Sequence, residues 1–437
     1  MASSPTRARR VALDVMRALR RGELLDRAIE RHARPLDARD LAWTRELLYG
    51  TQRLRGRLDH LLARRVRGGL EALEPDVLDV LRLGAYQLLE MGGVPRYAAI
   101  SQSVDLVRAA GSPRAAGLVN GVLRALERAE GEREFPDPSR DPVGYLCTWG
   151  SHPRWLVERW LARWSFAEVE RLTEANNQRP ELYIRPVGMT ASDAQTRLQE
   201  VGVSASTVEG FPRSLRLPSG SELGTVLEAV PALVQDPAAA LVVDYADVPA
   251  GATVLDLCSA PGGKTAGMAE RAAFVAAADL SLARIERVRQ NTERVGIADR
   301  VAMVVADGRV PPFRPVDVVL LDAPCTGTGT FRRHPDGRWR IGSTELESLV
   351  GLQRELLDAA AELVRPGGLL VYATCSLEPE ENEAQVEQFL QRHPRFVRDP
   401  VPGGLDPAVI TAEGDLQILP QRQGVDGAYA ARLRSSD

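Results

Sequence analysis

The feature that most constrains this chain is a regular alternation of strand-like and helical sequence that begins near residue 251. Apolar runs of strand length lie at 253–258, 274–280, 301–307, 316–322 and 369–375. Helical sequence is expected between them, as at 282–295, which Gly296 closes, and at about 344–364. Strands that alternate with helices in this way are typical of a parallel sheet. We therefore predict a doubly wound, Rossmann-like α/β domain over 239–437.

The part of the chain before this domain is predicted to contain two further folds. Apolar residues from 6 to about 130 keep a helical period, which predicts an all-α domain over 1–135. A polar, proline-rich linker is expected at 130–142. Residues 145–238 combine a helical stretch with four short strands, LYIRP, STVEGF, SLRL and ALVQD, and predict a small α+β domain. Trp160 and Trp164 lie one helical turn apart in it, a spacing that favours core packing over base stacking.

Composition excludes several classes of protein. A hydrophobic share of 44% with 26% charged residues is typical of a soluble globular protein, and no apolar run is long enough for a membrane span. The Arg-rich N-terminus resembles a transit peptide, but its helical pattern continues without a break, so we expect a cytoplasmic protein without membrane partners. Four cysteines without a CxxC pair predict neither disulfides nor a metal site.

Charge is unevenly distributed along the chain. The net charge is −4, yet residues 1–67 hold 17 Arg against 8 acidic residues. This basic segment is compatible with binding RNA, and equally with a solvated helical surface. No sustained heptads are present, and we expect a monomer.

The loop after the first strand of the α/β domain is the first candidate site. It consists of Cys258, Ser259, Ala260, Pro261, Gly262, Gly263 and Lys264, the last being the chain's one lysine. Its two glycines allow a ligand to approach the backbone, and the following helix favours a ligand carboxylate, such as that of S-adenosylmethionine. The end of the loop, GGKT, also matches a phosphate-binding loop, but Cys258 replaces the first required glycine.

Three acidic residues end successive strands of the predicted sheet. Asp279 ends the second strand, at the approximate distance from the glycine loop where an acid binds ribose hydroxyls. Asp307 ends the third strand and Asp322 the fourth. An alternative for Asp279, which precedes Ser281 by two residues, is a helix N-cap. An acidic edge suits a cationic nucleoside cofactor better than a triphosphate.

Two cysteines are predicted to share the same edge of the sheet. Cys325 follows the fourth strand and Cys375 ends the fifth. A thiolate that attacks C6 of cytosine turns C5 into a nucleophile that can accept a methyl group. The bond must then be reversed, which needs a base and gives a second cysteine a task. Asp322 is a candidate to face N3 of the base, or alternatively the cofactor.

At these residues the chain resembles the RsmB/Sun family of ribosomal RNA cytosine-C5 methyltransferases, a group that includes the Nop2 and NSUN enzymes. The resemblance rests on VLDLCSAPGGKT, DAPCTGTGT, HPDGRW and YATCSLEPEENE and extends over nearly the whole chain. HPDGRW differs from the usual motif by having arginine where lysine is common, which changes the geometry of the charge. DGAY at 426–429 has alanine where an aromatic residue is usual.

The resemblance implies functions for the domains and for the candidate residues. The N-terminal domain would be NusB-like and bind RNA, and the middle domain would be a small extension. Cys375 would be the nucleophile and Cys325 the second cysteine. The 258–264 loop would bind S-adenosylmethionine together with the three strand-end acids. The substrate would be a cytosine of small-subunit (16S) ribosomal RNA, extruded from its helix or held in a loop.

Three alternatives remain open from the sequence. The same chemistry could act on transfer RNA. A P-loop nucleotide hydrolase would explain GGKT and would bind ATP with magnesium. A non-catalytic RNA-binding or antitermination factor would explain the helical front, and its RNA binding would not depend on either cysteine.

Overall fold

The computed structural model describes residues 4–129 and 135–436, so the first five residues of the predicted linker lie outside the described residues. The chain forms two compact units, Met1–Gln178 with Phe331–Ile341, and Arg179–Thr330 with Gly342–Asp437. The expected domain ranges 1–135, 145–238 and 239–437 stay a prediction. The small α+β fold packs with the large sheet of the second unit because Tyr183 and Phe211 share an apolar core with it.

The first unit is helical, as the sequence predicts. Its core contains fully buried apolar residues from several helices, including Val15, Leu48, Leu81 and Leu123. Its helices are α1 (Arg7–Arg20), α2 (Leu25–His32), α3 (Ala38–Arg53), α4 (Arg55–Ala63), α5 (Pro75–Leu89), α6 (Arg96–Ala109), α7 (Ala116–Arg128), α8 (Pro142–Thr148), α9 (Arg154–Leu161), α10 (Phe166–Asn177) and α16 (Gly337–Arg340). Among the described residues of both units, no helix is long and apolar enough to cross a bilayer.

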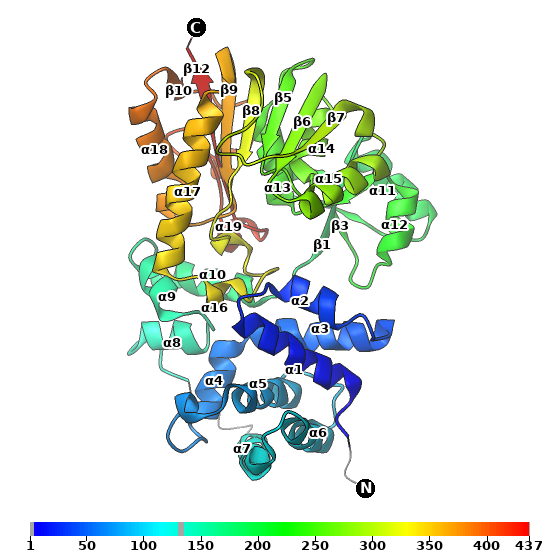
Figure 1. Ribbon diagram of the computed structural model, residues 1–437, viewed down its shortest axis with the longest axis vertical. Coiled ribbons are helices and arrows are strands. Elements are labelled where there is room, and N and C mark those ends of the chain that lie inside the picture. The colour runs from blue at the N-terminus through cyan, green and yellow to red at the C-terminus, as the bar shows by residue number, and fades with distance from the viewer. Residues whose placement is uncertain (1–3, 130–134, 437) are drawn as a thin grey trace. The chain divides into compact units, whose positions relative to one another are not determined.

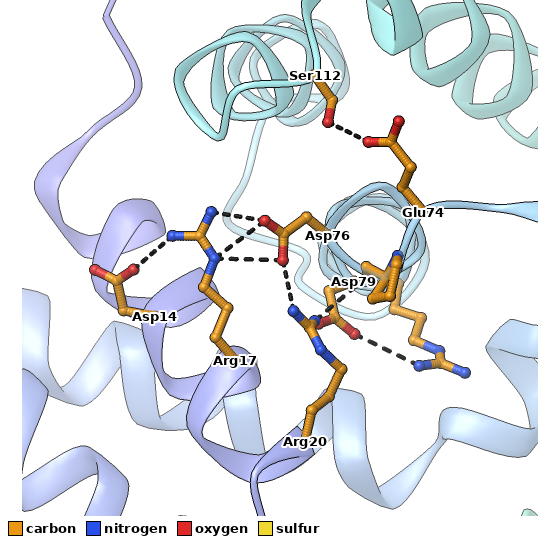
Figure 2. Close-up of polar contacts among 9 residues, drawn as sticks. Asp14, Arg17, Arg20, Glu74, Asp76, Asp79 and Ser112 are labelled. Carbon is orange, nitrogen blue, oxygen red and sulfur yellow. Dashed lines mark hydrogen bonds and ion pairs between the residues drawn. The ribbon is translucent and has the colours of Figure 1, made fainter.

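A network of ion pairs joins α1 to α5 in this unit (Figure 2). An Arg17 Nη lies 3.0 Å from Asp14 and another 2.7 Å from Asp76. Arg20 contacts Asp76 at 2.6 Å and also pairs with Asp79. These guanidinium groups are therefore neutralised within the helical unit, so the basic character of the N-terminal sequence overstates the positive charge offered to a nucleic acid.

The segment Phe331–Ile341 interrupts the second unit in sequence but packs within the helical unit. The buried guanidinium of Arg338 bonds to five oxygen atoms, those of Arg53 O, Ser151 O, Asn176 O, Phe331 O and Asn177 Oδ1. The indole N–H of Trp339 donates to the carbonyl of Gln52 at 2.7 Å. The HPDGRW motif is therefore anchored by main-chain carbonyls of the helical unit, an arrangement that no local sequence pattern predicts.

The two tryptophans of the HPRWLVERWLARW segment have different environments. Trp160 is fully buried and lies against the rings of His152 and Phe331. Trp164 is half-buried, with the guanidinium of Arg163 at 4.6 Å from its ring centre. The packing interpretation is correct for Trp160.

The second unit begins with a small antiparallel sheet of order β2-β3-β1-β4. Two helices pack with it through an apolar core that contains Ile184, Leu198 and Leu215. Its elements are β1 (Leu182–Pro186), α11 (Ala191–Glu200), β2 (Ser206–Val208), β3 (Phe211–Leu217), α12 (Leu223–Ala229) and β4 (Ala232–Val234). The predicted α+β fold and its four strands are confirmed.

The large sheet of this unit has the order β10-β12-β9-β8-β5-β6-β7, and β11 pairs with β12. Strands β7, β6, β5, β8 and β9 are parallel, whereas β12 runs antiparallel between β9 and β10. The strands are β5 (Thr253–Leu257), β6 (Phe274–Asp279), β7 (Val301–Val305), β8 (Val316–Asp322), β9 (Val364–Thr374), β10 (Phe396–Arg398), β11 (Leu416–Ile418) and β12 (Ala428–Ser435). The five predicted parallel strands are confirmed. Strand β9 begins at Val364 rather than at the expected residue 369, so Pro366–Gly368 lies inside the strand and not before it.

Helices cover both faces of this sheet (Figure 1). Val254 and Leu320 belong to the apolar core on one face, and Leu255 and Leu321 to the core on the other, as the two-residue period of a strand requires. The first core includes residues of α13 (Pro237–Ala246), α14 (Gly263–Ala269) and α15 (Leu282–Arg294), and the second includes residues of α17 (Ser343–Ala361) and α18 (Glu383–Arg392). A short helix α19 (Pro420–Gln423) precedes β12. The chain reverses its order of winding at β5, so the carboxyl ends of β5 and its neighbours are where a ligand is expected.

Candidate active site

The glycine loop lies at the carboxyl end of β5 and packs closely against α15. Gly262 has a φ of 97°, and a Cβ there would lie 3.2 Å from the Cα of Val288. A Cβ on Gly263 would lie 2.8 Å from the amide nitrogen of Gln235. Gly262 is therefore required by its left-handed backbone and by its close approach to α15, whereas a side chain at Gly263 would have to displace the end of the Gln235 side chain.

Asp279 lies against this loop. Its carboxylate accepts a hydrogen bond from the backbone N–H of Ala260 at 3.3 Å and one from Arg284 Nε at 3.1 Å. The N-cap of α15 is Ser281 rather than Asp279, so the capping alternative does not account for this acid. Buried to 5% exposure, Asp279 fixes the loop on the side of β6.

Asp307 has a different environment from the other two acids. Both of its oxygens accept hydrogen bonds from the side chain of Arg309. These bonds lower the pKa of Asp307 to about 2. Asp307 thus bonds to Arg309, two residues further along the chain, rather than to the glycine loop. The assignment of Asp307 to the cofactor site stays a prediction.

Lys264 and Asp322 form an ion pair at the centre of the edge, with Nζ 2.7 Å from Oδ2. Burial by itself lowers the pKa of Lys264, but the attraction and hydrogen bond of Asp322 outweigh burial and raise it. The ammonium group therefore stays charged, and its field acts on Cys375.

The two predicted cysteines meet. The Sγ atoms of Cys325 and Cys375 lie 3.3 Å apart, although 50 residues separate them in sequence. Both side chains are half-buried and both are free thiols. They come together because β8 and β9 are parallel neighbours and each cysteine follows the carboxyl end of its strand.

The environment makes these two thiols unequal. The hydrogen bond with Cys325 lowers the pKa of Cys375; burial and Asp322 raise it, and Lys264 lowers it. The same hydrogen bond raises the pKa of Cys325, and burial and the charges of Cys375 and Glu381 raise it further. Of the two sulfur atoms, Cys375 is therefore the one that loses its proton first, and Cys325 is the one that keeps its proton longer.

Two buried acids of this region were not singled out from the sequence. Asp256, inside β5, accepts a hydrogen bond from Thr265, and burial raises its pKa to about 7. Glu381, in a short 3-10 helix (Pro379–Glu381), is fully buried beside the Cys325 loop. Asp256 could have been found from the sequence, because it is a charged residue within the apolar run VLDLC. Nothing in the local sequence distinguishes Glu381 from its acidic neighbours.

Burial also sets the character of Cys258, the first residue of the loop. Its pKa is raised to about 12 by burial and then by Asp279 and Asp322. Cys258 is therefore a neutral thiol, and its part in the site is structural or a contact with a ligand rather than nucleophilic.

Apolar side chains stand exposed beside the strand-end acids. Leu280 is 70% exposed, Leu282 71% and Val310 75%, next to Asp279 and Asp307 in sequence. Apolar surfaces flanking carboxylates fit a nucleoside, whose base needs an apolar contact and whose ribose donates hydrogen bonds.

These features define a class of protein. A mostly parallel sheet with one antiparallel strand inserted near its edge, a glycine loop after β5 and an acid after β6 are the fold and the loop of an S-adenosylmethionine-dependent methyltransferase. This class does not include P-loop nucleotide hydrolases, and the hydrolase interpretation of GGKT is wrong.

Comparison with known proteins identifies the family. Three family models match the chain: the NusB family at residues 6–128, a ferredoxin-like domain of RsmF/B-like methyltransferases at 152–223, and 16S rRNA methyltransferase RsmB/F at 246–434. The protein belongs to the RsmB family of ribosomal RNA small subunit methyltransferases, as the sequence resemblance suggested.

Individual relatives match over almost their full length. A probable ribosomal RNA small subunit methyltransferase B from Synechocystis is 34% identical, with 98% of this chain and 99% of the relative covered. The ribosomal RNA small subunit methyltransferase B of Erwinia tasmaniensis is also 34% identical, with 97% of each chain covered. The crystal structure of PH0851 has a TM-score of 0.79 at 28% identity and covers 99% of both chains.

Proposed function

We propose that this protein transfers a methyl group from S-adenosylmethionine to C5 of a cytosine in small-subunit ribosomal RNA. The observation that carries the proposal is the 3.3 Å separation of two unequal sulfur atoms beside the Lys264–Asp322 pair. Family membership and the printed names of the relatives support the ribosomal substrate.

Cys375 acts first in this proposal. Its thiolate adds to C6 of the cytosine, and the electrons of the C5–C6 double bond move toward C5 and the N3 side of the ring. Lys264 keeps the thiolate available by lowering the pKa of Cys375. Asp322, 2.7 Å from Lys264, is the acid best situated to face N3 or the cofactor. S-Adenosylmethionine, when bound, supplies the methyl group that C5 accepts.

Cys325 acts in the release step. Once the sulfur of Cys375 is bonded to C6 it carries no charge, so two of the causes that raise the pKa of Cys325 disappear. Cys325 then becomes a better thiolate at the point where a base must remove the C5 proton. The electrons of the broken C5–H bond restore the C5–C6 double bond and expel Cys375 as a thiolate.

The cofactor would be held by the loop from Cys258 to Lys264 and by the acids at the strand ends. The fit is supported by Gly262, which approaches α15 closely and has a left-handed backbone, and by the exposed apolar residues beside Asp279. RNA would bind through the helical unit, which matches the NusB family, and we expect the protein to act as a monomer.

The first test is transfer of label from S-adenosylmethionine to undermodified small-subunit ribosomal RNA and, separately, to transfer RNA, with bisulfite sequencing of the product. A single protected cytosine in ribosomal RNA is expected. Label in transfer RNA alone would keep the reaction and overturn the substrate. Binding of RNA without any methyl transfer, in free RNA or in ribosomal particles, would favour the non-catalytic factor.

Two cysteine variants test the division of tasks. Cys325→Ala is expected to accumulate a covalent protein–RNA adduct that survives denaturing electrophoresis, because the nucleophile remains and release is impaired. Cys375→Ala is expected to form neither adduct nor product. Full activity of Cys375→Ala would refute its assignment as the nucleophile.

A further inference from the structure

Glu381 is a buried carboxylate whose hydrogen bonds hold the loop of Cys325. Its Oε1 accepts from the backbone N–H of Thr326 at 2.8 Å, and its Oε2 accepts from the hydroxyl of the same residue. The Nε2 of Gln353 donates to Oε1 at 2.9 Å. Among the described residues Glu381 has no ion-pair partner, so neutral donors stabilise its charge, these three and the hydroxyl of Ser376.

Such a carboxylate is costly to retain inside a protein. Burial raises the pKa of Glu381, while the hydrogen bonds of Ser376, Thr326 and Gln353 oppose that rise. A buried acid without a cation is unfavourable unless its acceptor sites are filled. Glu381 hydrogen-bonds to Thr326, the residue that follows Cys325, and this position indicates that the carboxylate is retained to hold the Cys325 loop.

Gln353 of α17 completes a clamp around Cys325. Besides its bond to Glu381, its Nε2 donates to the carbonyl of Pro324 at 2.9 Å. Pro324 and Thr326 are the two chain neighbours of Cys325, so the backbone is fixed on both sides of the thiol. We call Glu381 and Gln353, with these four hydrogen bonds, the Cys325 clamp.

The opposite cysteine has a main-chain hydrogen bond of its own, and its neighbour Ser376 also contacts the clamp. The carbonyl of Cys375 accepts from the backbone N–H of Gly329 at 3.0 Å. The hydroxyl of Ser376 lies 3.1 Å from that of Thr326 and 3.3 Å from that of Thr328. The clamp holds the backbone on both sides of Cys325, whereas at Cys375, which directly follows β9, it reaches only the hydroxyl of the next residue, Ser376.

We propose that Glu381 is a positioning residue that, through the clamp with Gln353, keeps Cys325 in hydrogen-bonding contact with Cys375. This inference deepens the proposed function and rests on it for its catalytic meaning. The hydrogen bond that the clamp maintains is what makes the two thiols unequal, so loss of the clamp would affect both formation of the thiolate and release of the product.

The inference can be tested without RNA by following alkylation of Cys375 with iodoacetamide as a function of pH, with peptide mass spectrometry to identify the modified cysteine. The midpoint of this profile reports the pKa of Cys375. The charged or titratable groups that act on the sulfur pair are Cys325, Asp322, Lys264 and Glu381, with Tyr372 near Cys325.

In Glu381→Gln, the direction in which the alkylation midpoint of Cys375 shifts distinguishes a positioning role of Glu381 from a direct effect of its charge. The negative charge of Glu381 by itself raises the pKa of Cys375, so its loss alone would lower the midpoint. Loss of the Cys325–Cys375 hydrogen bond instead raises the midpoint. We expect a rise of about one pH unit, the effect of one hydrogen bond to a charged group.

Gln353→Met provides a second variant that keeps the charge of Glu381. It removes the donations to Pro324 and Glu381 and is expected to raise the midpoint in the same direction. In a Cys325→Ala background, Glu381→Gln is expected to give no further rise, because the hydrogen bond is already absent. The control is Glu387→Gln, the same substitution at an exposed glutamate of α18, which should leave the profile unchanged.

Midpoints that are unchanged or lowered in both Glu381→Gln and Gln353→Met would overturn the inference. With RNA, the clamp variants are expected to release the covalent adduct at least about tenfold more slowly than the parent protein, the rate equivalent of one such hydrogen bond. If the parent protein transfers no methyl group although the alkylation profiles shift as expected, the proposed function fails and the positioning of Cys325 stands.

Discussion

Replacing Arg338 with methionine removes the guanidinium that anchors the HPDGRW motif within the helical unit. The side chain is fully buried, and within the described part of the chain its hydrogen-bond partners include no carboxylate. It donates to Ser151 O at 3.1 Å, Asn176 O at 3.0 Å, Phe331 O at 3.2 Å and Asn177 Oδ1 at 2.8 Å. Its fifth bond, to Arg53 O, is longer at 3.4 Å.

The size of the effect follows from the oxygens left behind. Each buried carbonyl that loses its donor costs about 1–3 kcal/mol. The carbonyl of Arg53 keeps the hydroxyl of Ser151 as a donor, so the other three main-chain carbonyls would cost roughly 3–9 kcal/mol. Burial lowers the pKa of Arg338 well below its usual range, which indicates that the guanidinium itself is costly to bury and offsets part of this sum. We therefore expect Arg338→Met to lower the free energy of unfolding by about 3–5 kcal/mol.

Thermal denaturation of the full chain, followed by circular dichroism, measures this loss. A fall of roughly 10 °C in the unfolding temperature of the helical unit is expected for a unit of its size. Arg338→Lys should recover part of the stability, because an ammonium has three donors and lacks the planar fork that reaches five oxygens. Arg340→Met, at an exposed arginine of the same helix, is the control. If Arg338→Met unfolded at the temperature of the control, the anchoring argument would be refuted.

Three further predictions concern ionisable groups. Burial raises the pKa of Asp256 from 3.8 to about 7, so the folded state binds a proton more tightly than the unfolded state and loses stability as pH rises between these values. Asp256→Asn should therefore raise the free energy of unfolding at pH 8, by at most about 4 kcal/mol, but not at pH 4. Denaturant titrations at the two pH values measure this difference, and equal stabilisation at both would contradict the prediction. Lys264→Met should raise the alkylation midpoint of Cys375 by removing the neighbouring cation, and a lowered midpoint would show that another group controls the thiolate. Asp76→Asn, which removes the ion pairs of Asp76 with Arg17 and Arg20 in the network of Figure 2, should cost about 1 kcal/mol or less for each pair because both are partly exposed. This cost should decrease in high salt.

Much of the fold and of the site could be predicted from local sequence. Apolar runs bounded by glycine and by strand-end acids gave the five parallel strands, and the parallel arrangement placed Cys325 and Cys375 at one edge. Periodicity of this kind depends on which face of an element is buried, and that information is contained in neighbouring residues. The antiparallel strand β12 between β9 and β10 was not predicted, because the order of strands depends on pairing between distant segments.

The sequence by itself determined the residue types of the site and the strand ends at which they lie. The tertiary structure decided which of them act on one another. Glu381 bonds to Thr326 across 55 residues of chain, and Arg338 bonds to Ser151 across 187, so neither pair belongs to any sequence period. The protonation of Cys375 depends on Cys325 and Lys264, which come close only when β5, β8 and β9 are assembled. Electrostatic and hydrogen-bond energies depend on distance in space and on burial, and both are set by the packed fold rather than by position in the chain.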